Sequence, residues 1–208
     1  RHSAPRVDVY LPEGNGPHPG VLLVHGGGFI IGGRSMKPMR RLTTGLVQAG
    51  YAVASIDYRK IGRGGSRLRG VDDVEAALAW WFEQSGRFGL DPERIGAIGL
   101  SAGATLLMLA SERPSSGTLR SRVSVFGLYD FGGIQGTLAG ALRTLLLRGQ
   151  DSGSVSPRRK VRSEVPITML HGTADQLVPI EQAREFALAR RAGGLAVELH
   201  ELDGAPHG

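Results

Sequence analysis

One short motif in the chain can do nucleophilic chemistry, the pentapeptide Gly99-Leu100-Ser101-Ala102-Gly103. An apolar run at 95–100 precedes the serine, and a helix-forming run at 104–110 follows it. This context predicts a sharp turn from a strand into a helix that presents the Ser101 hydroxyl beyond the sheet. The two glycines leave room for the backbone to double back. Because the chain has 32 glycines, the motif indicates a nucleophile only together with suitable partners.

A neutral serine hydroxyl is a weak nucleophile and needs a base to take its proton. We predict that His207 is this base, because it lies in a glycine- and proline-rich loop, 203–208, after the last predicted strand. The remaining histidines fit less well, since they lie in leader segments, inside a strand pattern, or at the start of glycine turns. These are His2, His18, His200, His25 and His171.

An imidazole base needs a carboxylate on its other ring nitrogen, which fixes the tautomer. Asp175 is the predicted partner, because it lies in a loop just beyond a predicted strand. Asp130, in a similar position after the preceding strand, is the alternative, and Asp203 is interpreted as a turn residue. The chain order Ser, Asp, His differs from the orders of chymotrypsin-like and subtilisin-like enzymes.

Attack on an acyl carbon creates an oxyanion that needs preorganised N–H donors. We predict the amide of Ala102, at the positive end of the following helix, as one donor. The amides of Gly27 and Gly28 are the other predicted donors, since missing side chains let a backbone approach a substrate closely. The alternative is an ordinary turn formed by the glycines after the buried strand.

Short apolar runs alternate with amphipathic segments along the chain. Strands are predicted at 6–11, 21–24, 51–56, 95–100, 123–126, 165–170 and 195–202, and helices at 38–50, 71–84, 104–110 and 180–191. This alternation predicts an α/β fold with a mostly parallel sheet and helices on both faces. His25, Ser101 and Asp175 all follow strand ends, so we expect them at one sheet edge.

Several further features are interpreted as structural. Asp72 and Asp73 are predicted to cap the helix that follows them. The run Asp57-Tyr58-Arg59 is predicted to brace the loops of the site by side-chain hydrogen bonds. The least regular stretch, 129–162, contains one amphipathic segment at 138–147 and is predicted to form a small lid or insert.

Composition limits the classes of function. A chain of 208 residues predicts one domain, 1–208, with a substantial core. Its net charge of +6 comes from scattered arginines without interleaved aromatic residues, which argues against a nucleic-acid partner. No apolar run approaches the roughly 20 residues of a membrane span, no cysteine is present, and no pattern indicates a metal or a nucleotide cofactor. No signal peptide is visible, so the sequence leaves open whether the protein is cytoplasmic or secreted.

Six short motifs together resemble the α/β-hydrolase esterases, in particular the hormone-sensitive-lipase-like and bacterial feruloyl/acetyl esterase-like branches. They are His25-Gly26-Gly27-Gly28-Phe29, Asp57-Tyr58-Arg59, Asp91-Pro92-Glu93-Arg94-Ile95, Gly99-Leu100-Ser101-Ala102-Gly103, His171-Gly172-Thr173-Ala174-Asp175 and His207-Gly208. The resemblance covers nearly the whole chain. It implies an acyl-enzyme mechanism in which Ser101 attacks, His207 moves the proton, Asp175 orients His207, and amides of Gly27, Gly28 and Ala102 hold the oxyanion.

The expected function is therefore hydrolysis of small short-chain acyl esters. Two alternatives stay open at this point: an amide hydrolase of the same fold, such as an arylformamidase or small peptidase, and a non-catalytic binding protein. The chain departs from the family pattern at Ala104, where a second glycine is common. Its short leader and the small 129–162 insert predict an open site, and the resemblance also implies a final helix after His207.

Overall fold

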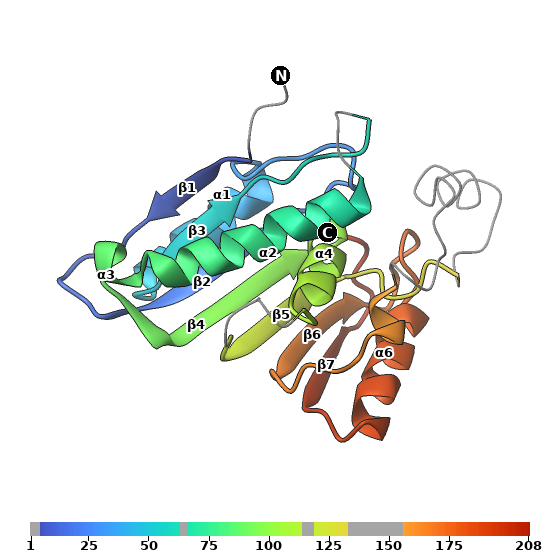
Figure 1. Ribbon diagram of the computed structural model, residues 1–208. Coiled ribbons are helices and arrows are strands. Elements are labelled where there is room, and N and C mark those ends of the chain that lie inside the picture. The colour runs from blue at the N-terminus through green and yellow to red at the C-terminus, as the bar shows by residue number, and fades with distance from the viewer. Residues whose placement is uncertain (1–4, 63–65, 114–118, 133–155) are drawn as a thin grey trace.

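The structure, a computed structural model, describes residues 5–62, 66–113, 119–132 and 156–208. Its centre is a seven-stranded sheet in the order β1-β3-β2-β4-β5-β6-β7 (Figure 1). Only the pairing of β1 with β3 is antiparallel, so the predicted mostly parallel sheet is confirmed. The strands are β1 Val7–Tyr10, β2 His18–Val24, β3 Ala52–Ile56, β4 Leu90–Leu100, β5 Ser121–Val125, β6 Ile167–Gly172 and β7 Val197–Leu202.

Apolar side chains fill both faces of the central strands. All five residues of β3 are buried, as are the last five of β2, which explains why their sequences are continuous apolar runs. One face packs against helices α2 (Arg67–Glu83), α4 (Ala102–Ala110) and α6 (Glu181–Ala192), through residues such as Trp81, Leu106 and Phe186. The other face packs against α1 (Lys37–Gln48) through Met39. Figure 1 shows α2 and α4 in front of the sheet, with α1 behind it.

Helices α1, α4 and α6 begin and end within two residues of their predicted positions, whereas α2 begins upstream of its predicted start. The helices are α1 Lys37–Gln48, α2 Arg67–Glu83, α3 Ser85–Phe88, α4 Ala102–Ala110, the 3-10 turn η2 Pro157–Arg159 and α6 Glu181–Ala192. The short helix α3 lies in a stretch for which no element was predicted. Strand β4 also begins at Leu90, upstream of the predicted start, because the Asp91-Pro92-Glu93 segment continues the strand.

The prediction that Asp72 and Asp73 cap α2 is wrong. The helix begins at Arg67, and the cap is Ser66, whose hydroxyl accepts a hydrogen bond from the Arg69 amide at 3.2 Å. Both aspartates therefore lie inside the helix. Asp73 accepts hydrogen bonds from the Arg59 amide and guanidinium, so it fastens the helix to the segment after β3.

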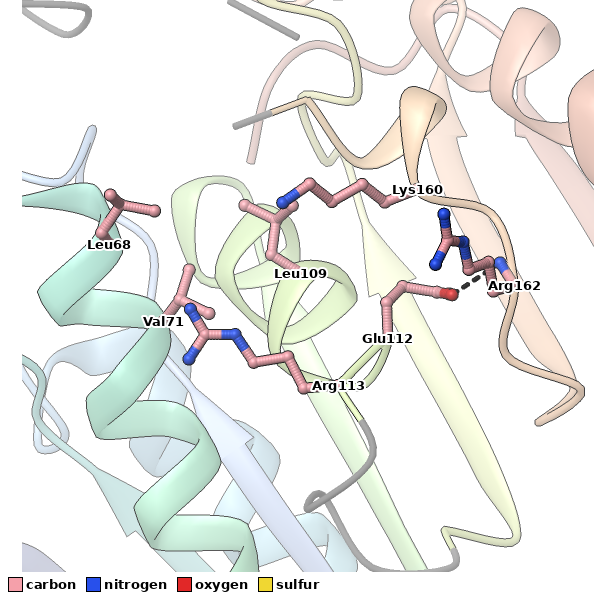
Figure 2. A pocket seen from close by; sticks show the side chains of 7 residues that line it. All are labelled: Leu68, Val71, Leu109, Glu112, Arg113, Lys160 and Arg162. Carbon is pink, nitrogen blue, oxygen red and sulfur yellow. Dashed lines mark hydrogen bonds between the residues drawn. The ribbon is translucent and has the colours of Figure 1, made fainter. Parts of the chain in front are cut away.

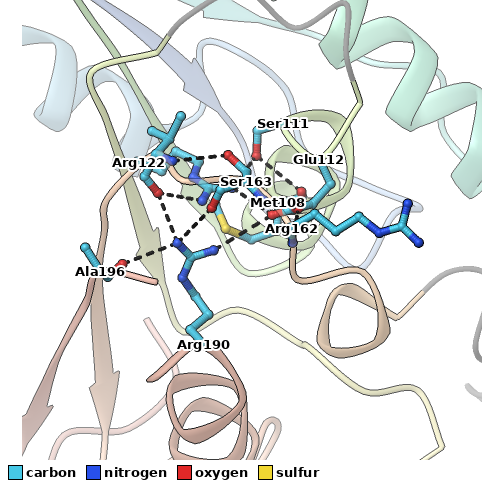
Figure 3. Close-up of polar contacts among 9 residues, drawn as sticks. Met108, Ser111, Glu112, Arg122, Arg162, Ser163, Arg190 and Ala196 are labelled. Atoms are coloured by element: carbon cyan, nitrogen blue, oxygen red, sulfur yellow. Dashed lines mark hydrogen bonds and ion pairs between the residues drawn. The ribbon is translucent and has the colours of Figure 1, made fainter. Parts of the chain in front are cut away.

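A buried cluster of charges joins β5 to α6 and to the segment that follows α4 (Figure 3). Arg122 of β5 donates to Glu112 at 3.2 Å and to the Val165 carbonyl at 2.7 Å. Arg190 of α6 donates to the Val165 and Ala196 carbonyls, and its guanidinium lies 3.9 Å from Glu112. Burial, together with the neighbouring Arg122 cation, lowers the pKa of Arg190 to about 10. One carboxylate thus balances two buried cations.

The predicted lid lies largely outside the described residues, because 133–155, which include the amphipathic segment 138–147, are not among them. Its first described residues are firmly packed: Tyr129 is buried and stacks on Phe186 with ring centroids 4.5 Å apart. In the part of the chain that the structure describes, every helix is too short or too polar to cross a membrane.

Candidate active site

Ser101 lies in the turn between β4 and α4, as the motif predicts. Its backbone has φ +50° and ψ −119°, a conformation that a residue with a side chain rarely adopts. Such strain costs on the order of 1–3 kcal/mol and persists only where the surroundings enforce it. One constraint is the hydrogen bond from the Ser101 amide to the Val125 carbonyl, 2.9 Å long.

The flanking glycines are required by close backbone contacts. A Cβ atom on Gly99 would lie 2.5 Å from the Ala104 Cα, and one on Gly103 would lie 2.3 Å from the Val24 carbonyl oxygen. Real Cβ atoms essentially never approach other atoms so closely. The turn that presents Ser101 therefore depends on both glycines, for the steric reason inferred from the sequence.

The structure brings Ser101, His207 and Asp175 together. The His207 Nε2 atom lies 3.0 Å from the Ser101 Oγ, and its Nδ1 lies 2.7 Å from the Asp175 Oδ2. A carboxylate oxygen accepts hydrogen bonds, so the proton belongs on Nδ1 and leaves Nε2 free to accept the serine proton. The Asp175 side chain is fully buried, whereas that of His207 is 17% exposed, so the relay runs from the interior to an accessible surface.

Two backbone amides hold the Asp175 carboxylate from the side opposite His207. Its Oδ1 accepts from the Leu177 amide at 2.9 Å and from the Val178 amide at 2.8 Å. The alternative acids make other contacts: Asp130 accepts from the Gly132 amide, and Asp203 accepts from the Thr173 hydroxyl. Among the described residues, Asp175 alone of the three is bonded to His207.

The loop that carries His207 is fastened to the end of β6. The Ala174 amide donates to the Ala205 carbonyl at 3.1 Å, and the Gly204 amide donates to the Thr173 hydroxyl at 2.8 Å. At Gly172 the two segments nearly touch, because a Cβ atom there would lie 2.1 Å from the Ala205 oxygen. The same segment thus places both Asp175 and the loop of its histidine partner.

Sequence reasoning missed two residues around this relay. Phe126, counted as part of a strand, follows β5 with φ +42°, and its ring centroid lies 4.7 Å from that of His207. His171, interpreted only as the start of a glycine turn, is buried beside Asp175. Both lie at the carboxyl ends of neighbouring strands, and that position is the signal that could have singled them out.

The glycine loop after β2 passes beside Ser101 at Gly26. Gly27 and Gly28 have φ values of +119° and +59°, and the Gly27 carbonyl turns back to accept from Ile30 and Ile31. Within the described ranges, the amides of Gly27, Gly28 and Ala102 donate to no protein acceptor. They are thus open to a substrate oxygen, and their role as oxyanion donors stays a prediction of the sequence.

His25 and Tyr58 brace the glycine loop from below. The two rings stack with centroids 4.3 Å apart, and the Tyr58 hydroxyl donates to the His25 carbonyl at 3.1 Å. The His25 Nδ1 lies 2.6 Å from the Gly26 carbonyl, so it donates there, and burial lowers the pKa of His25. A Cβ on Gly26 would lie 3.2 Å from that of Ser101, so this brace extends to the nucleophile.

Asp57 holds the far end of the same loop. It accepts from the Arg34 amide at 3.0 Å and from the Arg34 guanidinium at 2.6 Å. Burial alone would raise the pKa of Asp57, but the hydrogen bonds from Arg34 and the charges of Lys60 and Arg34 outweigh it and lower the pKa. The bracing role predicted for the Asp57-Tyr58-Arg59 run is confirmed for Asp57 and Tyr58, whereas Arg59 is bonded to Asp73 of α2 instead.

The described residues include no group of three or more His, Cys, Asp or Glu side chains that could hold a metal. A cavity of about 340 Å³ lies away from the relay, between α2, the end of α4 and the 160–162 segment (Figure 2). Leu68, Val71 and Leu109 form its apolar part. None of Ser101, Asp175 and His207 lines it.

Comparison with known proteins places the chain in a family. The model of the BD-FAE family matches residues 7–130, which is more than half of the chain. The chain belongs to the BD-FAE family. Membership confirms the resemblance to α/β-hydrolase esterases that the motifs indicated.

Relatives of this BD-FAE chain include named esterases. It is 30% identical to esterase LipC of Mycobacterium tuberculosis over 92% of this chain and 53% of LipC. It is 31% identical to a probable isoprenylcysteine alpha-carbonyl methylesterase of rice over 97% of this chain and 54% of that protein. The chain thus spans about half the length of the curated relatives it matches.

A solved structure confirms the fold. Thermogutta terrifontis esterase 2 with bound propionate superposes with a TM-score of 0.81 at 26% identity, over 98% of this chain and 80% of that one. The BD-FAE chain therefore has the α/β-hydrolase fold predicted from its sequence.

Proposed function

We propose that the protein is a serine carboxylesterase that hydrolyses short-chain acyl esters of small molecules through an acyl-enzyme intermediate. The observation that carries the proposal is the continuous relay from Ser101 through His207 to the buried Asp175, with contacts of 3.0 Å and 2.7 Å. Both distances are within hydrogen-bond reach, which a general base needs in order to take the proton of its nucleophile.

The first half-reaction transfers the acyl group to the enzyme. The Ser101 Oγ attacks the ester carbon while its proton passes to the His207 Nε2. Amides of Gly27, Gly28 and Ala102 hold the oxygen that becomes negative, and Asp175 stabilises the imidazolium. As the tetrahedral intermediate collapses, His207 gives the proton to the alkoxide, which leaves as an alcohol.

The second half-reaction returns the enzyme to its starting state. A water molecule gives one proton to the His207 Nε2 and attacks the acyl carbon, and the same amides hold the oxyanion. Collapse breaks the bond to Ser101, whose Oγ regains the proton from His207, and the carboxylic acid is released. The net reaction is an ester plus water giving an acid and an alcohol.

Known proteins support a short acyl group. The Thermogutta esterase has been solved with bound propionate and with bound butyrate, which are the acids of short esters. The same enzyme has been solved phosphonylated by sarin and phosphoramylated by tabun. Electrophiles of that kind capture an activated nucleophile, so an equivalent reaction is expected of Ser101.

The test compares p-nitrophenyl esters from acetate to decanoate with the wild type and Ser101→Ala. Exposed Ser35 provides the matched control, because Ser35→Ala removes a hydroxyl at the surface. We expect Ser101→Ala to lose essentially all activity and Ser35→Ala to keep it, with rates highest for the short acyl groups. Full activity in Ser101→Ala, or a phosphonate adduct on another residue, would refute the proposal. Faster cleavage of formyl-kynurenine than of any ester would assign an amide hydrolase instead.

A further inference from the structure

His171 lies directly behind the carboxylate of the relay. It is the next-to-last residue of β6, and its side chain is 1% exposed. The Nε2 atom of its ring lies 2.8 Å from the Val178 carbonyl oxygen and 3.2 Å from the Asp175 Oδ2. The mechanism above assigns no task to this imidazole.

The contacts of His171 fix its tautomer. A carbonyl oxygen only accepts hydrogen bonds, so Nε2 must carry the proton that it shares with Val178. The same nitrogen lies 3.2 Å from the Asp175 Oδ2, but its hydrogen bond goes to Val178. The Nδ1 atom is buried and has no hydrogen-bond partner in the described part of the chain, so Nε2 makes the polar contacts of the ring.

Asp175 is a buried anion, and such a group needs several donors. The amides of Leu177 and Val178 serve its Oδ1, so that oxygen is held by the backbone of its own turn. Its Oδ2, which faces His207, has two imidazole nitrogens near it. His171 is therefore a second imidazole beside the oxygen engaged by the base, and its hydrogen bond to Val178 holds the turn of that carboxylate independently of His207.

We propose that His171 is a positioning residue for catalysis: its Nε2–H holds the Val178 carbonyl and with it the turn 175–178 that carries Asp175, and so keeps His207 in line with Ser101. This inference rests on the proposed esterase function and concerns the same site. Without this bond the Val178 carbonyl loses its donor, and the turn that holds the Asp175 carboxylate loses one of its fixed points. Because His171 touches no substrate, the effect falls on kcat and leaves KM unchanged.

The decisive comparison is between His171→Phe and His171→Gln. Phenylalanine keeps a planar ring but removes the donor, whereas the glutamine amide can place an N–H near the position of Nε2. With p-nitrophenyl acetate we expect His171→Phe to lower kcat about 10- to 100-fold, with KM within about twofold. His171→Gln should recover most of that loss.

Two further readouts separate positioning from a purely structural role. The rate of inactivation by a p-nitrophenyl phosphonate reports the nucleophile directly and should fall in parallel with kcat. The low-field proton resonance of the His207–Asp175 hydrogen bond should shift or broaden in His171→Phe and be preserved in His171→Gln. If His171→Phe does not fold, His171→Leu takes its place, because the smaller leucine side chain does not overpack the site.

The inference is overturned if the variant without a donor keeps wild-type kcat, or if both variants lose kcat equally. Ser101→Ala is assayed in parallel. An inactive wild type, or an active Ser101→Ala, would contradict the esterase proposal itself. An active wild type with an inactive Ser101→Ala and an unaffected His171→Phe would contradict only the role of His171.

Discussion

The close approach at Gly172 offers a sharp test of how His207 is placed. A Cβ atom on Gly172 would lie 2.1 Å from the Ala205 carbonyl oxygen, whereas ordinary contacts begin at 3.4 Å. In Gly172→Ala the two segments must therefore separate by 3.4 − 2.1 = 1.3 Å. Ala205 precedes His207 by two residues, and the hydrogen bond from the Ala174 amide to its carbonyl would be stretched as well.

The expected result is a large loss of activity with a moderate loss of stability. A misplacement of about 1 Å in a catalytic group can cost about 100-fold in rate. Overpacking of this kind costs about 1–3 kcal/mol of stability, which a domain of this size can absorb. We therefore expect Gly172→Ala to fold and to lose about 100-fold in kcat for p-nitrophenyl acetate.

The matched control is Gly45→Ala, in the middle of α1, where an added Cβ meets nothing within 4 Å. This control should keep wild-type activity and gain up to about 1 kcal/mol, because alanine favours a helix over glycine. Urea unfolding gives the stability of each variant, and steady-state kinetics give kcat per folded molecule. Wild-type kcat in folded Gly172→Ala would refute the claim that this contact positions His207.

Three further perturbations test the frame around the site. Asp57→Asn should lower the free energy of unfolding by about 2 kcal/mol at pH 7. Because the folded state lowers the pKa of Asp57, its contribution to stability is complete above pH 3.8 and is lost as pH falls through the folded-state pKa. The difference between the two proteins should thus shrink toward pH 2, and a constant difference would contradict this. Glu112→Gln should cost about 3–5 kcal/mol in urea unfolding, because it leaves two buried arginines without a counter-charge; exposed Glu185→Gln should cost little, and equal losses would refute the argument. Ser66→Ala should cost about 1 kcal/mol of stability by removing the α2 cap, and a larger loss from Asp72→Ala would overturn the revised start of that helix.

Much of the fold could be predicted because local patterns and long-range packing agree. The runs 21–24 and 51–56 are continuously apolar since both faces of the sheet are covered, and β2 and β3 lie there. The site was predictable for a related reason. Parallel strands end at one edge, so Ser101 and Asp175 had to lie near each other, and the glycines around the serine have a steric reason that sequence spacing alone reveals.

The sequence predictions failed where side-chain contacts decide between local structures that the sequence favours about equally. Acidic residues favour the first turn of a helix, which made Asp72 and Asp73 attractive caps. The true cap, Ser66, lies in a glycine- and arginine-rich segment whose sequence indicates a loop. Asp73 lies inside the helix that begins there and is bonded to Arg59. Phe126 was missed because an aromatic residue at the end of a strand pattern usually indicates core packing.

Of the three residues of the relay, His207 depends most on contacts with residues far from it in the sequence. No secondary structure holds this histidine, yet its ring contacts Phe126 beyond β5 and Asp175 beyond β6, while its loop is bonded to Thr173 and Ala174. All of these supports except Phe126 belong to the segment 171–178. A base carried on a loop can therefore be as well placed as one on a strand, provided that a single rigid turn fixes both the loop and the carboxylate.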